Sequence, residues 1–157
     1  MIMIQRIQSI YFSLITLLSL VFISGSFLNF ADSTGAEINV TFNGIVRDRI
    51  GQSPELVEKL LPLSVLIILI SIISLIAIFI FKNRKLQSRF SLFLVILAAV
   101  LLIASIHVSF IIVSKFDARL IPGLKMIMPI AILILSILAY RGIRKDERLV
   151  KSYDRLR

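Results

Sequence analysis

The chain has 157 residues, 58% of them hydrophobic, with a mean hydropathy of +0.98 and a formal net charge of +9. A soluble domain of this length cannot bury so large an apolar share, so we expect most apolar side chains to face lipid. The absence of cysteine excludes disulfides, thiolate metal sites and cysteine nucleophiles. The positive charge lies almost entirely at the ends of apolar runs, and we therefore expect no nucleic-acid partner.

Four apolar segments predict transmembrane helices, at residues 7–30, 62–81, 90–114 and 120–140. The run from Leu63 to Phe81 has 19 residues without a charge, long enough to cross a hydrocarbon core of about 30 Å as a helix. The first run resembles a signal peptide but is longer than the usual apolar region of one, so we expect it to be retained. Short connections make neighbouring spans antiparallel. The predicted fold is an all-α integral membrane protein, a single domain over residues 1–157 that forms an up-and-down four-helix transmembrane bundle.

The distribution of Lys and Arg predicts the orientation. With the N-terminus inside, the first residues, the loop 82–89 and the tail 141–157 hold twelve basic residues, while the opposite side holds six. Cytoplasmic flanks of membrane helices carry the excess of Lys and Arg. We therefore expect both termini in the cytoplasm and the loop 31–61 on the extracytoplasmic side.

That loop contains two short β-prone runs on either side of Asn43-Gly44, a dipeptide that favours a tight turn, so a small hairpin is predicted there. Ser53 can cap a helix that begins at Pro54, a residue whose missing N–H costs nothing in the first turn. We expect this helix, PELVEKLL, to lie at the membrane interface before the second span begins at Pro62.

Ionisable residues inside the spans are limited to His107 and Lys125, both towards the outer ends of their helices. Haem ligation would need a second histidine, which only another subunit can supply, so we expect a neutral His107 that is hydrogen-bonded to a serine or a carbonyl. Lys125 is expected to extend its ammonium to the headgroups. The acidic residues all lie in loops or the tail. We therefore expect no catalytic, cofactor-binding or metal-ligating residue, no cofactor and no enzymatic activity.

Small and polar residues form stripes on the first and third predicted helices. They recur at spacings of three, four or seven residues, at Ser9, Ser13, Thr16, Ser19, Ala98, Ser105 and Ser109. Such stripes let membrane helices approach closely and hydrogen-bond. We favour packing within the protein, and the docking of a partner subunit on the same faces is the alternative.

The tail, RGIRKDERLVKSYDRLR at residues 141–157, follows directly on the fourth span and contains seven basic and three acidic residues. On a helix its apolar residues gather on an arc of about 140°, into which Asp146 intrudes. Basic residues beside a membrane fix the orientation and contact anionic headgroups, and the apolar stripe indicates a further role in docking. The predicted docking residues are Ile143, Arg144, Lys145, Arg148, Leu149, Val150, Tyr153 and Leu156.

The segments MIQRIQSIY, residues 3–11, and KDERLVKSYDRLR, residues 145–157, resemble those of a family of small bacterial inner-membrane proteins, the domain of unknown function 4293. The likeness extends over the whole chain in length and in its four spans, and its specificity lies in these two end motifs. It implies a Gram-negative cytoplasmic membrane and Met3 as the usual start, and it carries over no catalytic or binding residue.

Three functions are compatible with this sequence. We favour a non-catalytic accessory or structural subunit of a bacterial inner-membrane complex, because intramembrane chemistry is scarce while the cytoplasmic ends carry polar detail. Its partners would be other inner-membrane subunits and anionic lipid headgroups. The alternatives are a small oligomeric transporter or channel, in which Lys125, His107 and the serine stripes line water, and a protein that binds anionic lipid through its basic tail.

Overall fold

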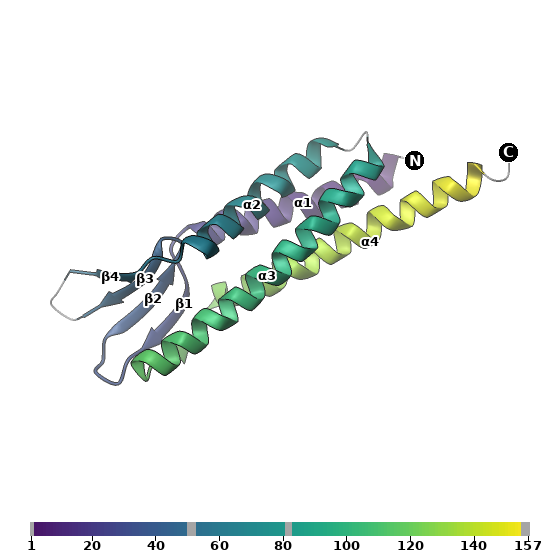
Figure 1. The fold of residues 1–157 in the computed structure, drawn as a ribbon. Helices are drawn as coiled ribbons and strands as arrows, with labels where there is room; N and C mark the ends of the chain where they lie inside the picture. Colours follow the sequence, from purple (N-terminus) through teal and green to yellow (C-terminus); the bar gives the residue numbers. More distant parts are fainter. Residues whose placement is uncertain (1, 50–52, 81–82, 155–157) are drawn as a thin grey trace.

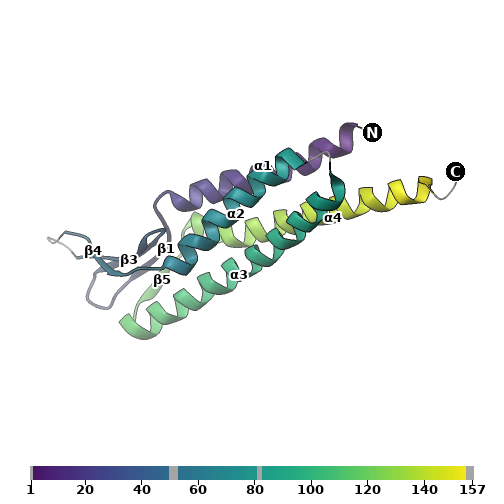
Figure 2. The ribbon, with the colours of Figure 1, turned by 45° about the horizontal axis from the view of Figure 1, so that its top comes forward.

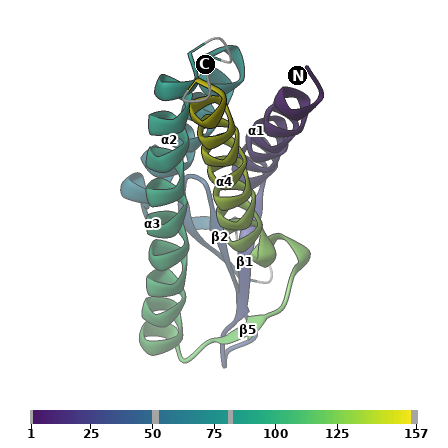
Figure 3. The same cartoon turned by 90° about the vertical axis from the view of Figure 1, so that its right-hand side faces the viewer.

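The computed structural model describes residues 2–49, 53–80 and 83–154, which form four long helices and one β-sheet (Figure 1). The helices are α1 (Ile2–Ile23), α2 (Leu61–Phe79), α3 (Arg84–Phe116) and α4 (Met128–Asp154), and a short 3-10 helix, η2 (Leu124–Ile127), leads into α4. Helices α1 and α3 each pack against both α2 and α4. Seen from the end that carries the chain termini, α4 lies between α3 and α1 (Figure 3).

Three helices in the described part of the chain are long and apolar enough to cross a membrane: Leu61–Phe79, Arg84–Phe116 and Leu124–Arg148. The described side chains of α1 form a shorter apolar helix, Ile7–Ile23. Only 39%, 33% and 28% of the most apolar window of the three long helices is buried inside the protein. The outward faces are therefore largely apolar, as expected of helices that lipid surrounds.

The turn between α2 and α3 is closed by polar side chains at helix ends. Asn83 caps α3, where its side-chain oxygen accepts from the backbone N–H of Leu86 at 3.2 Å. The buried side chain of Gln87 donates to the carbonyl of Ala77 in the last turn of α2 at 3.1 Å. This carbonyl belongs to the group that lacks a partner at a helix C-terminus, so Gln87 fixes the start of α3 against the end of α2.

The sheet contains five antiparallel strands in the order β4-β3-β2-β1-β5. The strands are β1 (Ser26–Ala31), β2 (Glu37–Thr41), β3 (Gly44–Asp48), β4 (Glu55–Glu58) and β5 (Arg119–Ile121). They form a lobe, here called the sheet lobe, at the end of the helices opposite the chain termini (Figures 1 and 2). The expectation of an all-α fold is therefore wrong.

Two apolar segments that were expected to extend membrane helices form strands of this sheet instead. Helix α1 ends at Ile23, the chain turns at Gly25 with a φ of +83°, and residues 26–31 become β1. Residues 120 and 121, expected at the start of the fourth span, pair with β1 as part of β5. The apolar side chains of β1 that prolong the hydrophobic run, Phe27 and Phe30, are buried in the protein core.

The expected hairpin around Asn43-Gly44 is confirmed, because β2 and β3 pair from Thr41 opposite Gly44 onwards. The expected helix from Pro54 is wrong, since residues 55–58 form β4 and pair with β3. The strand β3 would otherwise present an unpaired backbone edge, and pairing with β4 satisfies those groups. Tertiary pairing thus overrides a local helix-start signal.

Helix α3 has 33 residues and is about 50 Å long, which exceeds a hydrocarbon core of about 30 Å. Its last turns therefore stand beside the sheet lobe (Figure 1). There the guanidinium of Arg47 on β3 lies 5.5 Å from the ring centre of Phe116, and Lys115 lies 3.5 Å from the carboxylate of Glu58 on β4. The end of α3 and the sheet therefore form one packed unit.

Replacing Gly44 is expected to break the contact between β3 and β4. Its φ is +148°, and a Cβ there would lie 2.1 Å from the backbone oxygen of Glu58. We expect Gly44→Ala to lower the free energy of unfolding by about 3 kcal/mol or more, through backbone strain and overpacking together. Thermal unfolding in mild detergent measures the change. Gly35→Ala is the matched control, because Gly35 has a φ of +80° but open space around its Cβ position, and should cost about 1 kcal/mol.

Candidate functional site

Helix α4 runs without interruption from the apolar segment into the charged tail. It begins at Met128 and continues to Asp154, so the tail is helical over its described residues, as expected. Its C-terminal turns extend past the ends of the other helices in both side views (Figures 1 and 2). The charges of the tail are therefore carried on a rigid extension of a helix that is apolar enough to span a membrane.

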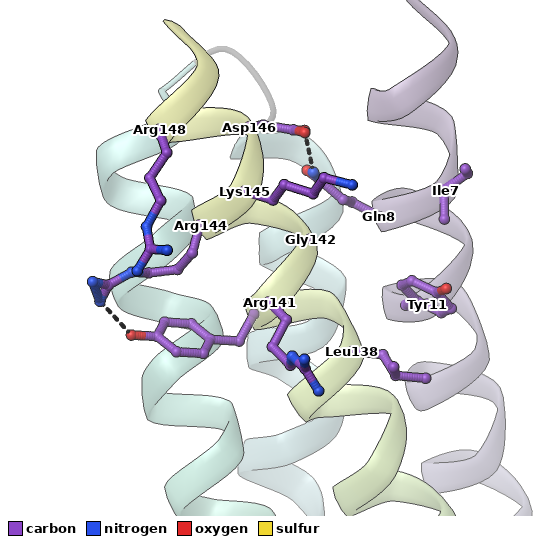
Figure 4. Close-up of a pocket in the computed structure, with 11 residues that line it drawn as sticks. Ile7, Gln8, Tyr11, Leu138, Arg141, Gly142, Arg144, Lys145, Asp146 and Arg148 are labelled. Atoms are coloured by element: carbon purple, nitrogen blue, oxygen red, sulfur yellow. Dashed lines mark hydrogen bonds between the residues drawn. The ribbon is translucent and has the colours of Figure 1, made fainter. Parts of the chain in front are cut away.

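A groove of about 920 Å³ lies between the beginning of α1 and this part of α4 (Figure 4). One part of its lining is apolar or aromatic and consists of Ile7, Tyr11, Leu138 and Tyr140. The other part is polar and consists of Gln8, Arg141, Arg144, Lys145, Asp146 and Arg148, with Gly142 between them. The groove therefore combines an apolar wall with four basic side chains and a single acidic one.

The two walls of the groove are joined by one hydrogen bond. The side-chain amide of Gln8, only 5% exposed, donates to the carboxylate of Asp146 (Figure 4). Gly142 lies beside this contact, and a Cβ there would be in ordinary van der Waals contact with the Cγ of Gln8 at 3.5 Å. Asp146, which interrupts the apolar arc of the tail, therefore pairs with α1.

The basic side chains of the groove differ in their surroundings. Arg144 donates to the Tyr140 hydroxyl at 2.8 Å, and its guanidinium lies 5.6 Å from the centre of that ring. Figure 4 shows Arg141 and Lys145 on the side of α4 that faces α1, whereas Arg144 and Arg148 point to the other side. The four basic side chains of the lining thus point to two sides of α4.

The structure separates the predicted docking residues into three groups. Arg144, Lys145 and Arg148 are exposed. Ile143 packs in the hydrophobic core and is 2% exposed, so it is not available to a partner. The remaining predictions fall outside the side chains that the structure describes, and they are Leu149, Val150, Tyr153 and Leu156.

The predicted stripe on α1 serves packing within the protein only in part. The Thr16 hydroxyl lies 2.8 Å from the hydroxyl of Ser74 on α2, and the buried Ser19 donates to the carbonyl of Ile15 at 2.8 Å. Ser13 is exposed and Ser9 is partly buried. The stripe therefore joins α1 to α2 in its second half.

The small residues of α3 lie mostly inside the protein. Ala98 and Ser105 are buried, and Ser109 is partly buried. The hydroxyl of Ser105 donates to the carbonyl of Leu101 one turn earlier at 2.8 Å. This part of α3 packs against the neighbouring helices and is not a free docking face.

The two ionisable residues predicted within the spans have different environments. His107 is exposed and makes no hydrogen bond within the described part of the chain, so the expected pairing with a serine or a carbonyl is not observed. Lys125 donates to the backbone carbonyl of Ser24, directly after the end of α1. Its positive charge thus lies where the C-terminus of α1 presents unpaired carbonyls, an interaction that the sequence did not indicate.

A second polar cluster lies in the sheet lobe and is closed by its own contacts. The Asp32 carboxylate, 5% exposed, accepts from the Arg47 side chain, from Ser33 at 3.1 Å and from Thr34 at 3.0 Å. Burial raises the pKa of Asp32, but the hydrogen bonds from Thr34 and Ser33 and the charge of Arg47 outweigh it, so the pKa lies below its ordinary value. These contacts hold the turn between β1 and β2 against β3.

The sequence analysis missed the α1 side of the groove. Gln8, Tyr11 and Ile7 belong to the N-terminal motif MIQRIQSIY, and Lys145, Asp146 and Arg148 belong to the C-terminal motif KDERLVKSYDRLR. The two motifs that carry the family resemblance therefore face each other across one groove. A signal for this pairing was present in the polar Gln8 within an apolar run and in Asp146 within the apolar arc.

The bond between Gln8 and Asp146 is testable by a double-mutant cycle. We expect Asp146→Ala to lower the free energy of unfolding by about 1–3 kcal/mol, because it leaves the buried Gln8 amide without a partner. The double variant Gln8→Leu/Asp146→Leu should lose less than the sum of the single Leu variants. Thermal unfolding in mild detergent is the measurement. Strict additivity of the two single changes would contradict the pairing.

Asp32 is expected to stabilise the sheet lobe only while it is ionised. Because its folded pKa lies below the ordinary value of 3.8, its contribution is present above pH 3.8 and is lost as the pH falls through the lower folded value. We expect Asp32→Asn to lower the free energy of unfolding at neutral pH and to reduce the further loss of this free energy at acid pH. Thermal unfolding as a function of pH measures both effects. Glu37→Gln, at an exposed position in β2, is the control and should lose stability at acid pH as the wild type does. If Asp32→Asn also lost stability at acid pH as the wild type does, the stabilising role of the ionised Asp32 would be contradicted.

The comparison with protein families supports the resemblance that the two end motifs carry. Neither the curated proteins nor the solved structures contain a match to this chain. The family model described as a domain of unknown function, DUF4293, matches residues 4–156, which include all but the outermost residue of each end motif and every described residue of the groove. The chain therefore belongs to the DUF4293 family.

Proposed function

We propose that this protein is a non-catalytic accessory or structural subunit of an assembly in the bacterial inner membrane. It crosses the membrane four times, with both termini in the cytoplasm. Its cytoplasmic end docks onto an acidic surface of a partner subunit through the extension of α4. The carrying observation is that α4 continues as one helix from its apolar segment through the basic tail and projects past the other helices.

The chemistry of the projecting helix favours an acidic protein surface. Arg144 and Arg148 are exposed and point away from α1 (Figure 4). Arg144 is held in place by Tyr140, which reduces the conformational entropy lost when a partner carboxylate binds. Arginine also offers the planar, paired donors that suit carboxylates. This surface is thus arranged before a partner arrives.

The placement of hydroxyl groups favours docking over transport. Thr16, Ser19, Ser105 and Ser136 each donate to the carbonyl four residues earlier in their own helix, at 2.7–3.0 Å. Hydroxyls that line a water-filled path would instead be oriented towards water or substrate. These four hydroxyls are therefore satisfied within their own helices.

The arrangement of the ends supports the proposed orientation. The start of α1, the end of α2, the start of α3 and the end of α4 lie at one end of the helices, and the sheet lobe lies at the other (Figure 1). Counted along the sequence, the segments 1–6, 82–89 and 141–157 contain twelve basic residues, and the segments 31–61 and 115–125 contain six. The positive-inside rule then assigns the first end to the cytoplasm and the sheet lobe to the opposite side.

Site-specific crosslinking in the native host membrane tests this proposal. A photo-reactive amino acid at Arg148 should give one discrete adduct with another membrane protein, at an acidic segment of that partner. Charge reversal by Arg144→Glu should lower the adduct yield by about tenfold, since about 1.4 kcal/mol of lost attraction corresponds to that factor. The matched control is Lys85→Glu, an exposed residue at the same end of the molecule, which should leave the yield within about twofold.

An exchange of charges between the two proteins is the most specific test. Replacing the crosslinked acidic residue of the partner by lysine should restore the adduct with the Arg144→Glu chain. The proposal fails if the protein purifies in mild detergent as a monomer without a stoichiometric partner and gives no adduct at position 148. It fails equally if Lys85→Glu reduces the yield as much as Arg144→Glu, because the effect would then be one of net charge alone.

A further inference from the structure

The groove between α1 and α4 contains two basic side chains that the protein does not neutralise. Arg141 and Lys145 are exposed, lie on the side of α4 that faces α1, and form no ion pair or hydrogen bond within the described residues (Figure 4). Asp146, which accepts from Gln8, is the single acidic residue of the lining against four basic ones. The groove therefore retains an uncompensated positive charge that a bound anion would balance.

The apolar wall of the groove opens onto the surface that lipid is expected to cover. Ile7 is 51% exposed and Leu138 is 40% exposed, and both line the groove. They continue the outward apolar faces of α1 and α4, which include Ile10 and Ile134. A molecule held against this wall is therefore in contact with both the groove and the surrounding lipid.

The groove lies at the depth of the lipid headgroups. On α4 the apolar segment gives way to charge between Leu138 and Arg141, so the cations begin where the hydrocarbon core ends. The two tyrosines of the lining, Tyr11 and Tyr140, are of the type that concentrates at this boundary. A phosphate held between Arg141 and Lys145 would thus be at the level of the phosphates of one leaflet.

We propose that this groove binds one anionic phospholipid. Arg141 and Lys145 hold its phosphate, and the first part of an acyl chain lies along Ile7, Tyr11 and Leu138. The volume of about 920 Å³ is in the range of sites that hold small organic ligands, and it is sufficient for a headgroup with the beginning of a chain. The apolar wall distinguishes such a ligand from a free phosphate or a soluble acidic peptide, neither of which would use it.

This site adjoins the proposed partner surface, because Arg144 and Arg148 also contribute to the lining of the groove. The lipid site uses Arg141 and Lys145, which face α1, and the partner surface uses Arg144 and Arg148, which point away from it. The lipid inference does not depend on the proposed function. A variant that loses lipid binding but keeps partner binding, or the reverse, can therefore be recognised.

Native mass spectrometry of the purified full-length protein tests the inference. Protein in a neutral detergent is mixed with phosphatidylglycerol as the anionic probe and with phosphatidylcholine as the zwitterionic comparator. We expect the wild type to hold one phosphatidylglycerol, and Arg141→Ala/Lys145→Ala to weaken this binding by about 30-fold, which corresponds to about 2 kcal/mol for two phosphate contacts. Binding of phosphatidylcholine should be weaker in the wild type and nearly unchanged by the substitutions.

The matched control is Lys85→Ala/Arg89→Ala, which removes the same two residue types at the same spacing and at the same end of the molecule. It should change the affinity by less than about twofold. Thermal unfolding of each variant confirms that it is folded, and Arg141→Lys/Lys145→Arg, which preserves the charges, should retain most of the binding.

Three results would overturn the inference. One is an equal loss of phosphatidylglycerol in the control variant, which would indicate diffuse attraction to net charge. Another is displacement of the lipid by inorganic phosphate at equal concentration, which would indicate a site for a free anion. The third is unchanged binding after Tyr11→Ala/Leu138→Ala, since the apolar wall would then have no part in the site.

Discussion

A hydrocarbon core offers no hydrogen-bonding partner, so each polar group placed in it must find one within the protein. This constraint accounts for most of the polar contacts along the helices. Hydroxyls such as those of Ser19 and Ser105 donate to their own helices, and Gln87 pairs with the carbonyl of Ala77 at the end of α2. Groups that satisfy one another in this way are not free to recognise a ligand. The proposed recognition sites accordingly lie at one end of the helices.

The two ends differ in their balance of charge. Towards the sheet lobe, residues 31–61 and 115–125 contain six basic and six acidic residues, and among them Asp32 pairs with Arg47 and Glu58 with Lys115. At the opposite end, the described part of the tail presents more cations than the single carboxylate of the groove balances. An anionic ligand or partner therefore gains more from this end than from the lobe. The asymmetry is the physical reason for placing the proposed functions there.

One helix connects these functions to the membrane. Because α4 is continuous from its apolar segment to the tail, residues on different sides of it face different surroundings while sharing one rigid backbone. Arg141 and Lys145 face the groove beside α1, whereas Arg144 and Arg148 face outward. A lipid bound in the groove would thus be a direct neighbour of the partner surface. The hydrogen bond from Gln8 to Asp146 keeps the two walls of the groove in register.

The sequence by itself determined the features that depend on local composition: the long apolar helices, the turn at Asn43-Gly44 and the helical basic tail. Only the tertiary structure decided which ends of the apolar runs leave the helices, because residues 26–31 and 120–121 continue those runs in the sequence and become strands through pairing with each other. It also decided the groove, whose hydrogen bond joins residues 138 positions apart. Local periodicity records which face of a segment is apolar, but a contact between distant segments depends on how the helices pack, which no local pattern contains.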